Sequence, residues 1–147
     1  MNVEECVQKG QLLKIEPDLA KARSSLDIAA HKLDLAYREK EHELWEGAIV
    51  NGYTAMFHSA RALLFKDGYK ERSHYAVGVF VREKYGHRLE KKFLNAFDSL
   101  RLQRHEVLYA LERNSEADEE EATDAVEGAD GFLQAVEKII NVKESKK

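Results

Sequence analysis

The chain has 147 residues, 44% of them hydrophobic and 34% charged, and its one proline, Pro17, leaves long helices favoured over short strands joined by turns. Its formal net charge of -4 argues against a nucleic-acid groove covering a whole face, because such a groove concentrates lysine and arginine, but it allows a local basic pocket. A single cysteine, Cys6, together with the absence of a signal pattern or an apolar run of about 18 residues, indicates a cytoplasmic protein without a membrane span.

The first two elements that the pattern predicts are a short helix over Val3–Ile15 and a long helix after Pro17. Proline suits the first helical turn, and Asp18 beside it is favoured by the positive end of the helix dipole. Apolar residues then recur at steps of three and four, so the second helix should reach Glu39–Glu43.

The most apolar stretch, Trp45–Phe65, predicts the central helix of a bundle. Asp67-Gly68 should end that helix. Ser73 is the expected N-cap of a fourth helix that begins at His74, and Gly86 should interrupt it.

Two more helices complete the predicted fold. The fifth spans about Arg88 to Arg113, and the sixth begins at Ser115, which with Asp118 has the form of a capping box. The expected buried side of the last helix consists of Ala122, Ala125, Ala129, Phe132, Val136, Ile139 and Ile140. The sequence thus predicts an all-α protein, an antiparallel bundle of five to six helices that forms a single domain over residues 1–147.

One arginine of the fifth helix falls on its apolar side. The apolar side follows a four-three heptad spacing at Phe93, Phe97, Leu100, Val107 and Leu111. The position that continues this spacing is Arg104. A buried guanidinium is costly unless it is paired, so Arg104 needs a carboxylate on another helix, a partner surface or an anionic ligand.

Arg101, His105 and Tyr109 follow each other at intervals of four, which puts them on one stripe beside Arg104. Such a group holds what metal-independent RNA cleavage needs, a cation for the phosphate and a side chain that moves protons near neutral pH. A plain solvent-facing role for His105 is the alternative.

The predicted central helix carries a second polar stripe. Asn51, Thr54, His58 and Arg61 are spaced three, four and three residues apart, and they either face water or line a cleft opposite Arg104, where they would bind a phosphate or a base. Nothing in the sequence decides between the two.

The connection 66–74 is rich in cations and leads into a helix N-terminus at Ser73 and His74, where free N–H groups favour anions such as phosphate. An ordinary turn would also use glycine and polar residues here. The sequence has no glycine-rich phosphate loop and no zinc-ligand spacing, so no metal or cofactor is expected.

Several separated motifs together resemble one family. They are Tyr53-Thr54-Ala55-Met56-Phe57-His58-Ser59-Ala60-Arg61-Ala62-Leu63-Leu64, Gly68-Tyr69, Ser73-His74 and Arg104-His105-Glu106-x-x-Tyr109. In this order they resemble small archaeal and bacterial HEPN-domain proteins, over most of the chain.

The resemblance implies a helical bundle that pairs as a homodimer, with a cleft near the interface. There an arginine and a histidine that are separated by four to six residues act as a metal-independent endoribonuclease. Many such proteins are toxins encoded beside a minimal nucleotidyltransferase that serves as antitoxin, and others bind nucleotides or act as helper subunits.

This sequence departs from that motif. Four residues separate Arg104 from Tyr109, which stands where the histidine would be, and no histidine follows His105. Tyrosine, with a reference pKa near 10, is a poor base at neutral pH. We therefore expect a module that binds a nucleotide or RNA phosphate and partners a nucleotidyltransferase. The alternatives are a ribonuclease toxin that uses His105 or Tyr109 to move protons, and a structural protein whose site has decayed.

Overall fold

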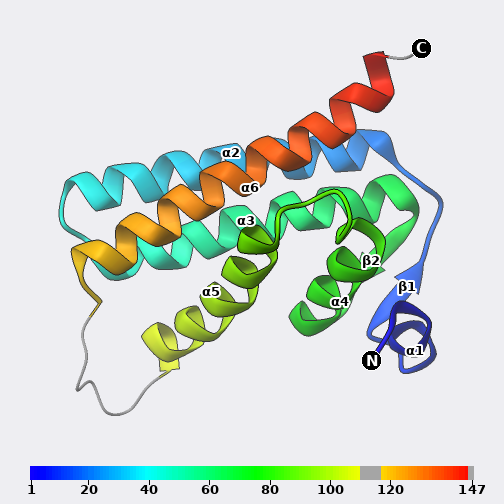
Figure 1. Cartoon of the computed structure of the whole chain (residues 1–147), viewed down its shortest axis with the longest axis horizontal. Coiled ribbons are helices and arrows are strands. Elements are labelled where there is room, and N and C mark those ends of the chain that lie inside the picture. The colour runs from blue at the N-terminus through cyan, green and yellow to red at the C-terminus, as the bar shows by residue number, and fades with distance from the viewer. Residues whose placement is uncertain (110–116, 146–147) are drawn as a thin grey trace.

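The computed structural model describes residues 1–109 and 117–145 and, within them, all side chains except those of residues 106, 107, 109 and 142–145. The described residues form six helices and a small two-stranded sheet (Figure 1). In chain order the elements are α1 Val3–Gln8, β1 Leu12–Lys14, α2 Leu19–Glu41, α3 Trp45–Asp67, β2 Tyr69–Glu71, α4 His74–Tyr85, α5 Lys91–Tyr109 and α6 Glu119–Ser145. The predicted all-α bundle is confirmed.

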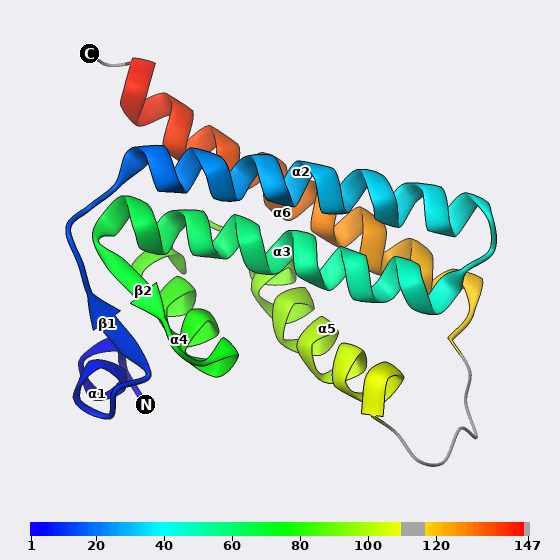
Figure 2. The ribbon, with the colours of Figure 1, turned by 180° about the vertical axis from the view of Figure 1, so that it is seen from behind.

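Helix α3 is the centre of the bundle, as its apolar sequence predicts. It contacts α2 and α6, which run beside it for much of its length, and it also contacts α4 and α5. Figures 1 and 2 show α2, α3 and α6 as one group of long helices, with α4 and α5 lying against α3 on another side. A site built on α3 can therefore receive side chains from several other helices.

Short polar side chains cap the starts of α2 and α4. Asp18 accepts a hydrogen bond from the Lys21 amide at 2.9 Å, so it is the N-cap of α2, and Pro17 lies just before the helix instead of in its first turn. Ser73 accepts from the Ala76 amide at 3.0 Å and starts α4 at His74, as predicted. These caps satisfy N–H groups that a helix leaves without internal partners.

The start of α6 was predicted wrongly. Asp118 accepts from the Glu121 amide at 2.8 Å and is the residue before the helix, so it takes the capping role assigned to Ser115. Ser115 itself lies outside the described residues, as does the end of the fifth helix predicted at Arg113.

The predicted first helix, Val3–Ile15, is also wrong in extent. Helix α1 ends at Gln8, because Gly10 adopts a left-handed backbone with φ 74° that a right-handed helix cannot contain. The chain then enters β1, which pairs antiparallel with β2 in the register Leu12 to Glu71. The connection 66–74 is accordingly part strand.

The buried side of α6 is as predicted, since all seven of its expected core residues are buried. Phe132 lies at the centre, with its ring 6.3 Å from that of Phe93 and 6.2 Å from that of Phe97 on α5. These rings fix α5 against α6. None of the helices, as far as the structure describes them, is long and apolar enough to cross a membrane.

Candidate anion-binding site

Three helices bring aromatic and cationic side chains together around Tyr53. This α3 residue is 1% exposed, and its hydroxyl oxygen lies 2.7 Å from Nδ1 of His74, the first residue of α4. The guanidinium carbon of Arg104, on α5, lies 5.5 Å from the centre of the Tyr53 ring. We call Tyr53, Phe57, His74, Arg101 and Arg104 the Tyr53 cluster.

His74 is held in place by a stack of rings. Its imidazole lies 4.2 Å from the Phe57 ring at an interplanar angle of 18°, and 5.8 Å from the Tyr53 ring at 16°. One face and Nδ1 of the imidazole are thereby occupied, yet the residue as a whole is exposed. The stack thus holds the imidazole in position while the residue keeps access to solvent.

The protonation of the Tyr53 and His74 pair follows from its surroundings. Burial raises the pKa of Tyr53 to about 12, although Arg104 and Arg101 act to lower it, so the hydroxyl keeps its proton at neutral pH. Partial burial and Arg104 lower the pKa of His74, against an opposing effect of Glu71, so the imidazole is neutral. Within the described chain the hydroxyl has no other hydrogen-bond partner. We therefore assign its proton to the bond with Nδ1, which makes Nε2 an N–H donor.

The two arginines of the cluster have no carboxylate partner among the described residues. Arg104 and Arg101 are half-buried, and neither is within ion-pair distance of a described aspartate or glutamate. A guanidinium stacked on a ring gains about 0.5–1 kcal/mol at exposed sites, but its positive charge is not neutralised. The salt bridge considered for Arg104 is absent from the described part of the chain.

A second group of polar side chains continues from the cluster along α3. The His58 ring meets the Phe57 ring edge-on at 5.5 Å and 80°, and Nδ1 of His58 is buried without a hydrogen-bond partner among the described residues. Burial, Arg61 and Lys32 lower the pKa of His58. Arg61 donates from Nε to Glu71 Oε1 at 3.0 Å, so its charge is partly compensated.

The structure brings together several residues that the sequence singled out, namely His58, Arg61, Ser73, His74, Arg101 and Arg104. The remaining three are placed differently. Asn51 donates a hydrogen bond to Glu39 of α2. His105 is exposed on α5. Tyr109 ends α5, and its side chain lies outside the described part.

Sequence reasoning missed Tyr53, Phe57 and Glu71. Both aromatic residues stand at helical spacing in the most apolar stretch, where they are naturally read as core. One signal was available, because a buried tyrosine hydroxyl usually finds a polar partner. The partner itself, His74, is set by tertiary packing.

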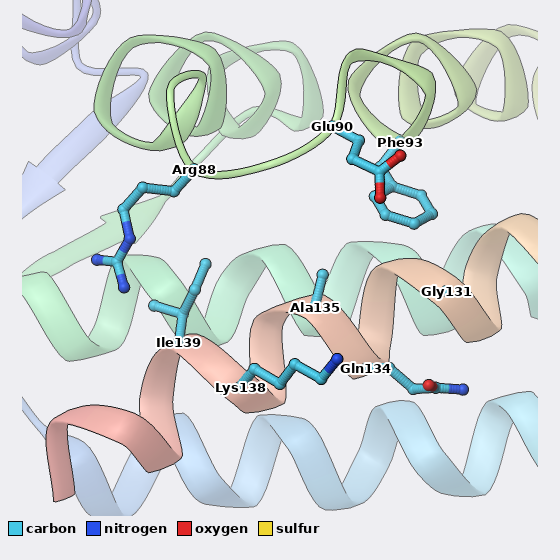
Figure 3. Close-up of a pocket in the computed structure, with 8 residues that line it drawn as sticks. All are labelled: Arg88, Glu90, Phe93, Gly131, Gln134, Ala135, Lys138 and Ile139. Carbon is cyan, nitrogen blue, oxygen red and sulfur yellow. The ribbon is translucent and has the colours of Figure 1, made fainter.

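The pocket drawn in Figure 3 lies elsewhere, between the start of α5 and α6. It has a volume of about 460 Å³, an apolar floor that includes Phe93 and Ile139, and charges of both signs from Arg88, Glu90 and Lys138. It shares no residue with the Tyr53 cluster, and its mixed charges do not select an anion. Among the described residues, no group of three or more histidine, cysteine, aspartate and glutamate side chains could hold a metal ion.

The protein is thus a small helical bundle that gathers arginine and histidine side chains around a buried tyrosine. Comparison with protein families makes this more specific. The model of the HEPN domain matches residues 22–139, and the chain belongs to this family. The match covers most of α2, all of α3 to α5 and most of α6, and hence every residue of the Tyr53 cluster. A search of curated proteins found no match.

The lowered pKa values of His58 and His74 predict how the stability of the fold depends on pH. Because their pKa values are lowered in the folded protein, the unfolded chain binds more protons once the pH falls below about 6.5. The free energy of unfolding should therefore fall as the pH drops from 7.5 to 5.5, by at most about 1.4 kcal/mol per pH unit for each histidine. Denaturant titrations at several pH values measure this dependence.

A variant separates this effect from general acid sensitivity. His58→Gln should flatten the pH dependence, whereas His31→Gln, an exposed residue of α2, should leave it as in the wild type. Equal slopes in all three proteins would contradict the assignment.

Proposed function

We propose that this HEPN domain binds a phosphate group of RNA or of a nucleotide through the Tyr53 cluster. The observation that carries the proposal is the placement of Arg104, which turns onto the buried Tyr53 ring without a carboxylate partner in the described chain. Arg101 adds a second guanidinium, and His74 adds a neutral N–H donor. Guanidinium groups match phosphate geometry through paired hydrogen bonds.

Family membership supports two further parts of the proposal. The HEPN resemblance implies a homodimer and a minimal nucleotidyltransferase as partner, and we propose both for this chain, with the cytoplasm as its location. In this scheme the domain is a binding module of a toxin–antitoxin type pair.

Metal-independent RNA cleavage is the second candidate function. It is favoured by one observation, the neutral imidazole of His74 next to two arginines, since the N–H at Nε2 could give its proton to a leaving oxygen. Incubating the protein with RNA in the presence of a chelator, and comparing it with His74→Gln, tests this candidate. A cleavage activity that His74→Gln abolishes would favour it over simple binding.

Arg104→Ala tests the proposed binding. Replacing a charged donor to phosphate typically costs about 1.5–3 kcal/mol, so the variant should bind a short 5′-phosphorylated RNA about 10-fold to 150-fold more weakly than the wild type. Fluorescence anisotropy with labelled RNA measures the dissociation constant. Thermal unfolding of the variant shows whether its fold is intact.

Arg88→Ala is the matched control, because the Arg88 guanidinium lies 5.8 Å from the centre of the Tyr85 ring and thus makes the same kind of contact at a different place. It should bind RNA within twofold of the wild type. If the wild type binds neither RNA nor nucleotides, or if both variants bind equally, the proposal is wrong. A loss confined to Arg88→Ala would move the site to the pocket of Figure 3.

A further inference from the structure

The pocket of Figure 3 separates opposite charges along its length. It lies between the start of α5 and α6 and has a volume of about 460 Å³. Arg88 stands at one end and Glu90 at the other, with Ile139 and Ala135 between them (Figure 3). A ligand that fills the pocket therefore meets a cation, an apolar middle and an anion in that order.

A glycine of α6 allows the apolar floor to form. A Cβ atom at Gly131 would lie 2.6 Å from Cε1 of the Phe93 ring, so the ring packs directly on the backbone of α6. The same ring lies 6.3 Å from that of Phe132, which fixes it from the core side. Glycine inside a helix is destabilising, and its place here is explained by the close approach of the ring.

Arg88 is held at its end by the short connection between α4 and α5. Its amide and that of Leu89 both donate to the carbonyl oxygen of Tyr85 at 2.9 Å, and the Leu89 side chain is buried. The nearby carboxylate of Glu90 pairs with Lys92, and among the described residues Arg88 has no ion-pair partner. A ligand carboxylate can therefore accept paired hydrogen bonds from this guanidinium.

Glu90 is accessible to a ligand although it has a partner. Nζ of Lys92 lies 3.5 Å from Oε2 of Glu90, and both side chains are 68% exposed. Ion pairs as exposed as this one contribute little to stability, because water screens them. A ligand ammonium can thus replace Lys92, whose own contact with the Phe93 ring at 5.2 Å is kept.

The rim on α6 offers one acceptor and one donor. Gln134 donates from Nε2 to Oδ1 of Asp130 at 2.8 Å, which leaves its amide oxygen to accept from an N–H group. Lys138 is exposed and makes no ion pair with a described residue, so its ammonium can donate to a carbonyl oxygen. The two residues are four apart and hence neighbours on the helix, which suits the N–H and C=O of a peptide backbone.

The length of the pocket sets the size of its ligand. Along α6 it extends from Gly131 to Ile139, which is eight residues or about 12 Å. An extended chain advances about 3.3–3.6 Å per residue, so three residues span about 10 Å. A single amino acid is too short, because its ammonium and carboxylate are attached to one carbon atom.

We infer that the pocket of Figure 3 binds a short peptide of about three residues. Its free carboxylate lies at Arg88, its free ammonium at Glu90, and an apolar side chain packs on Phe93, Ala135 and Ile139. The inference goes beyond the proposed function and does not depend on it, since the pocket shares no residue with the Tyr53 cluster.

The test titrates the tripeptide Ala-Leu-Ala into ¹⁵N-labelled protein and follows the amide signals by NMR. The signals of the pocket residues should shift and saturate. Acetylation of the amino end and amidation of the carboxyl end should each weaken binding about threefold to fivefold, as expected for the loss of one exposed ion pair. Gly-Gly-Gly, which has no apolar side chain, and free leucine, which cannot reach both ends, should also bind more weakly.

Two variants identify the ends of the peptide. Arg88→Gln should weaken Ala-Leu-Ala about threefold to fivefold and leave the affinity of the amidated peptide unchanged, because that peptide has no carboxylate to lose. Glu90→Gln should act in the same way on the free and the acetylated peptide. Lys91→Gln is the control, since Lys91 is an exposed cation next to Glu90 that does not line the pocket, and it should bind all peptides as the wild type does.

The absence of saturable shifts in the pocket with every peptide would overturn the inference. Equal affinity for Ala-Leu-Ala and for the peptide blocked at both ends would also overturn it. Hexanoate that binds as tightly as Ala-Leu-Ala would show that any apolar carboxylate fits, and would overturn the assignment of a peptide. None of these outcomes bears on RNA binding at the Tyr53 cluster, which the Arg104→Ala titration tests separately.

Discussion

Phe132→Ala is expected to lower the free energy of unfolding by about 3–5 kcal/mol. The Phe132 side chain is 0% exposed and fills the space between α6 and α5, where it contacts the rings of Phe93 and Phe97. Its removal takes away apolar contacts and leaves a cavity that helices on both sides cannot easily close. Denaturant unfolding followed by circular dichroism gives the change.

Tyr75→Ala is the control for this measurement. Tyr75 is also aromatic, but it is 47% exposed on α4, so its loss should change the free energy of unfolding by no more than about 0.5 kcal/mol. A cost below about 1 kcal/mol for Phe132→Ala would contradict the packing of α6 described above.

Phe132→Ala should also disturb the packing of the Tyr53 cluster. Phe97, which stacks on Phe132 at 6.2 Å, stacks on the Tyr53 ring at 5.7 Å and 13°. The core of the bundle and the candidate site are thus one continuous series of rings. Packing of these rings keeps the side chains of the Tyr53 cluster rigid, and a preformed anion site needs such rigidity.

The long helices could be predicted because their apolar residues repeat at the helical period over many turns. Helix α3 begins at Trp45 and ends at Asp67 with Gly68 as its C-cap, both as predicted. The sheet could not be predicted. Strand β1 has three residues, too few for an alternating pattern, and its partner lies 59 positions away, at Leu12 and Glu71.

Parts of the candidate site were also predictable. The heptad spacing places Arg104 on the inward side of α5, and the capping signal places Ser73 and His74 at the start of α4. The contacts between these elements could not be predicted, because the pairing of Tyr53 with His74 depends on how α3 and α4 cross. Asn51 was likewise not predictable, since the sequence left open whether it faces water or a cleft opposite Arg104, and in the structure it donates a hydrogen bond to Glu39 of α2.

Gly68→Ala is expected to destabilise the protein by about 2–5 kcal/mol. Gly68 ends α3 in a left-handed conformation with φ 90°, which costs a residue with a side chain about 1–2 kcal/mol. A Cβ atom there would also lie 2.8 Å from the backbone oxygen of Ile15. That oxygen cannot easily retreat, because the Ile15 amide donates to the Gly68 oxygen at 2.9 Å, so a further cost of about 1–3 kcal/mol follows.

Gly10→Ala isolates the effect of the close approach. Gly10 has a similar φ of 74°, but a Cβ atom there meets nothing within 4 Å, so only the conformational cost of about 1–2 kcal/mol applies. The difference between the two variants, measured by denaturant unfolding, is the cost of separating β1 from the end of α3. Equal effects would show that the contact with Ile15 does not constrain this turn.

The turn at Gly68 matters for the site because it directs the chain into β2 and from there to His74. Any movement that relieves the clash shifts β2, and with it Glu71 and the start of α4. Gly68→Ala should therefore weaken RNA binding more than Gly10→Ala does, although neither residue belongs to the Tyr53 cluster. If both variants bind RNA as the wild type does under conditions where they remain folded, the position of His74 does not depend on this turn, and the rings of Tyr53 and Phe57 alone hold it in place.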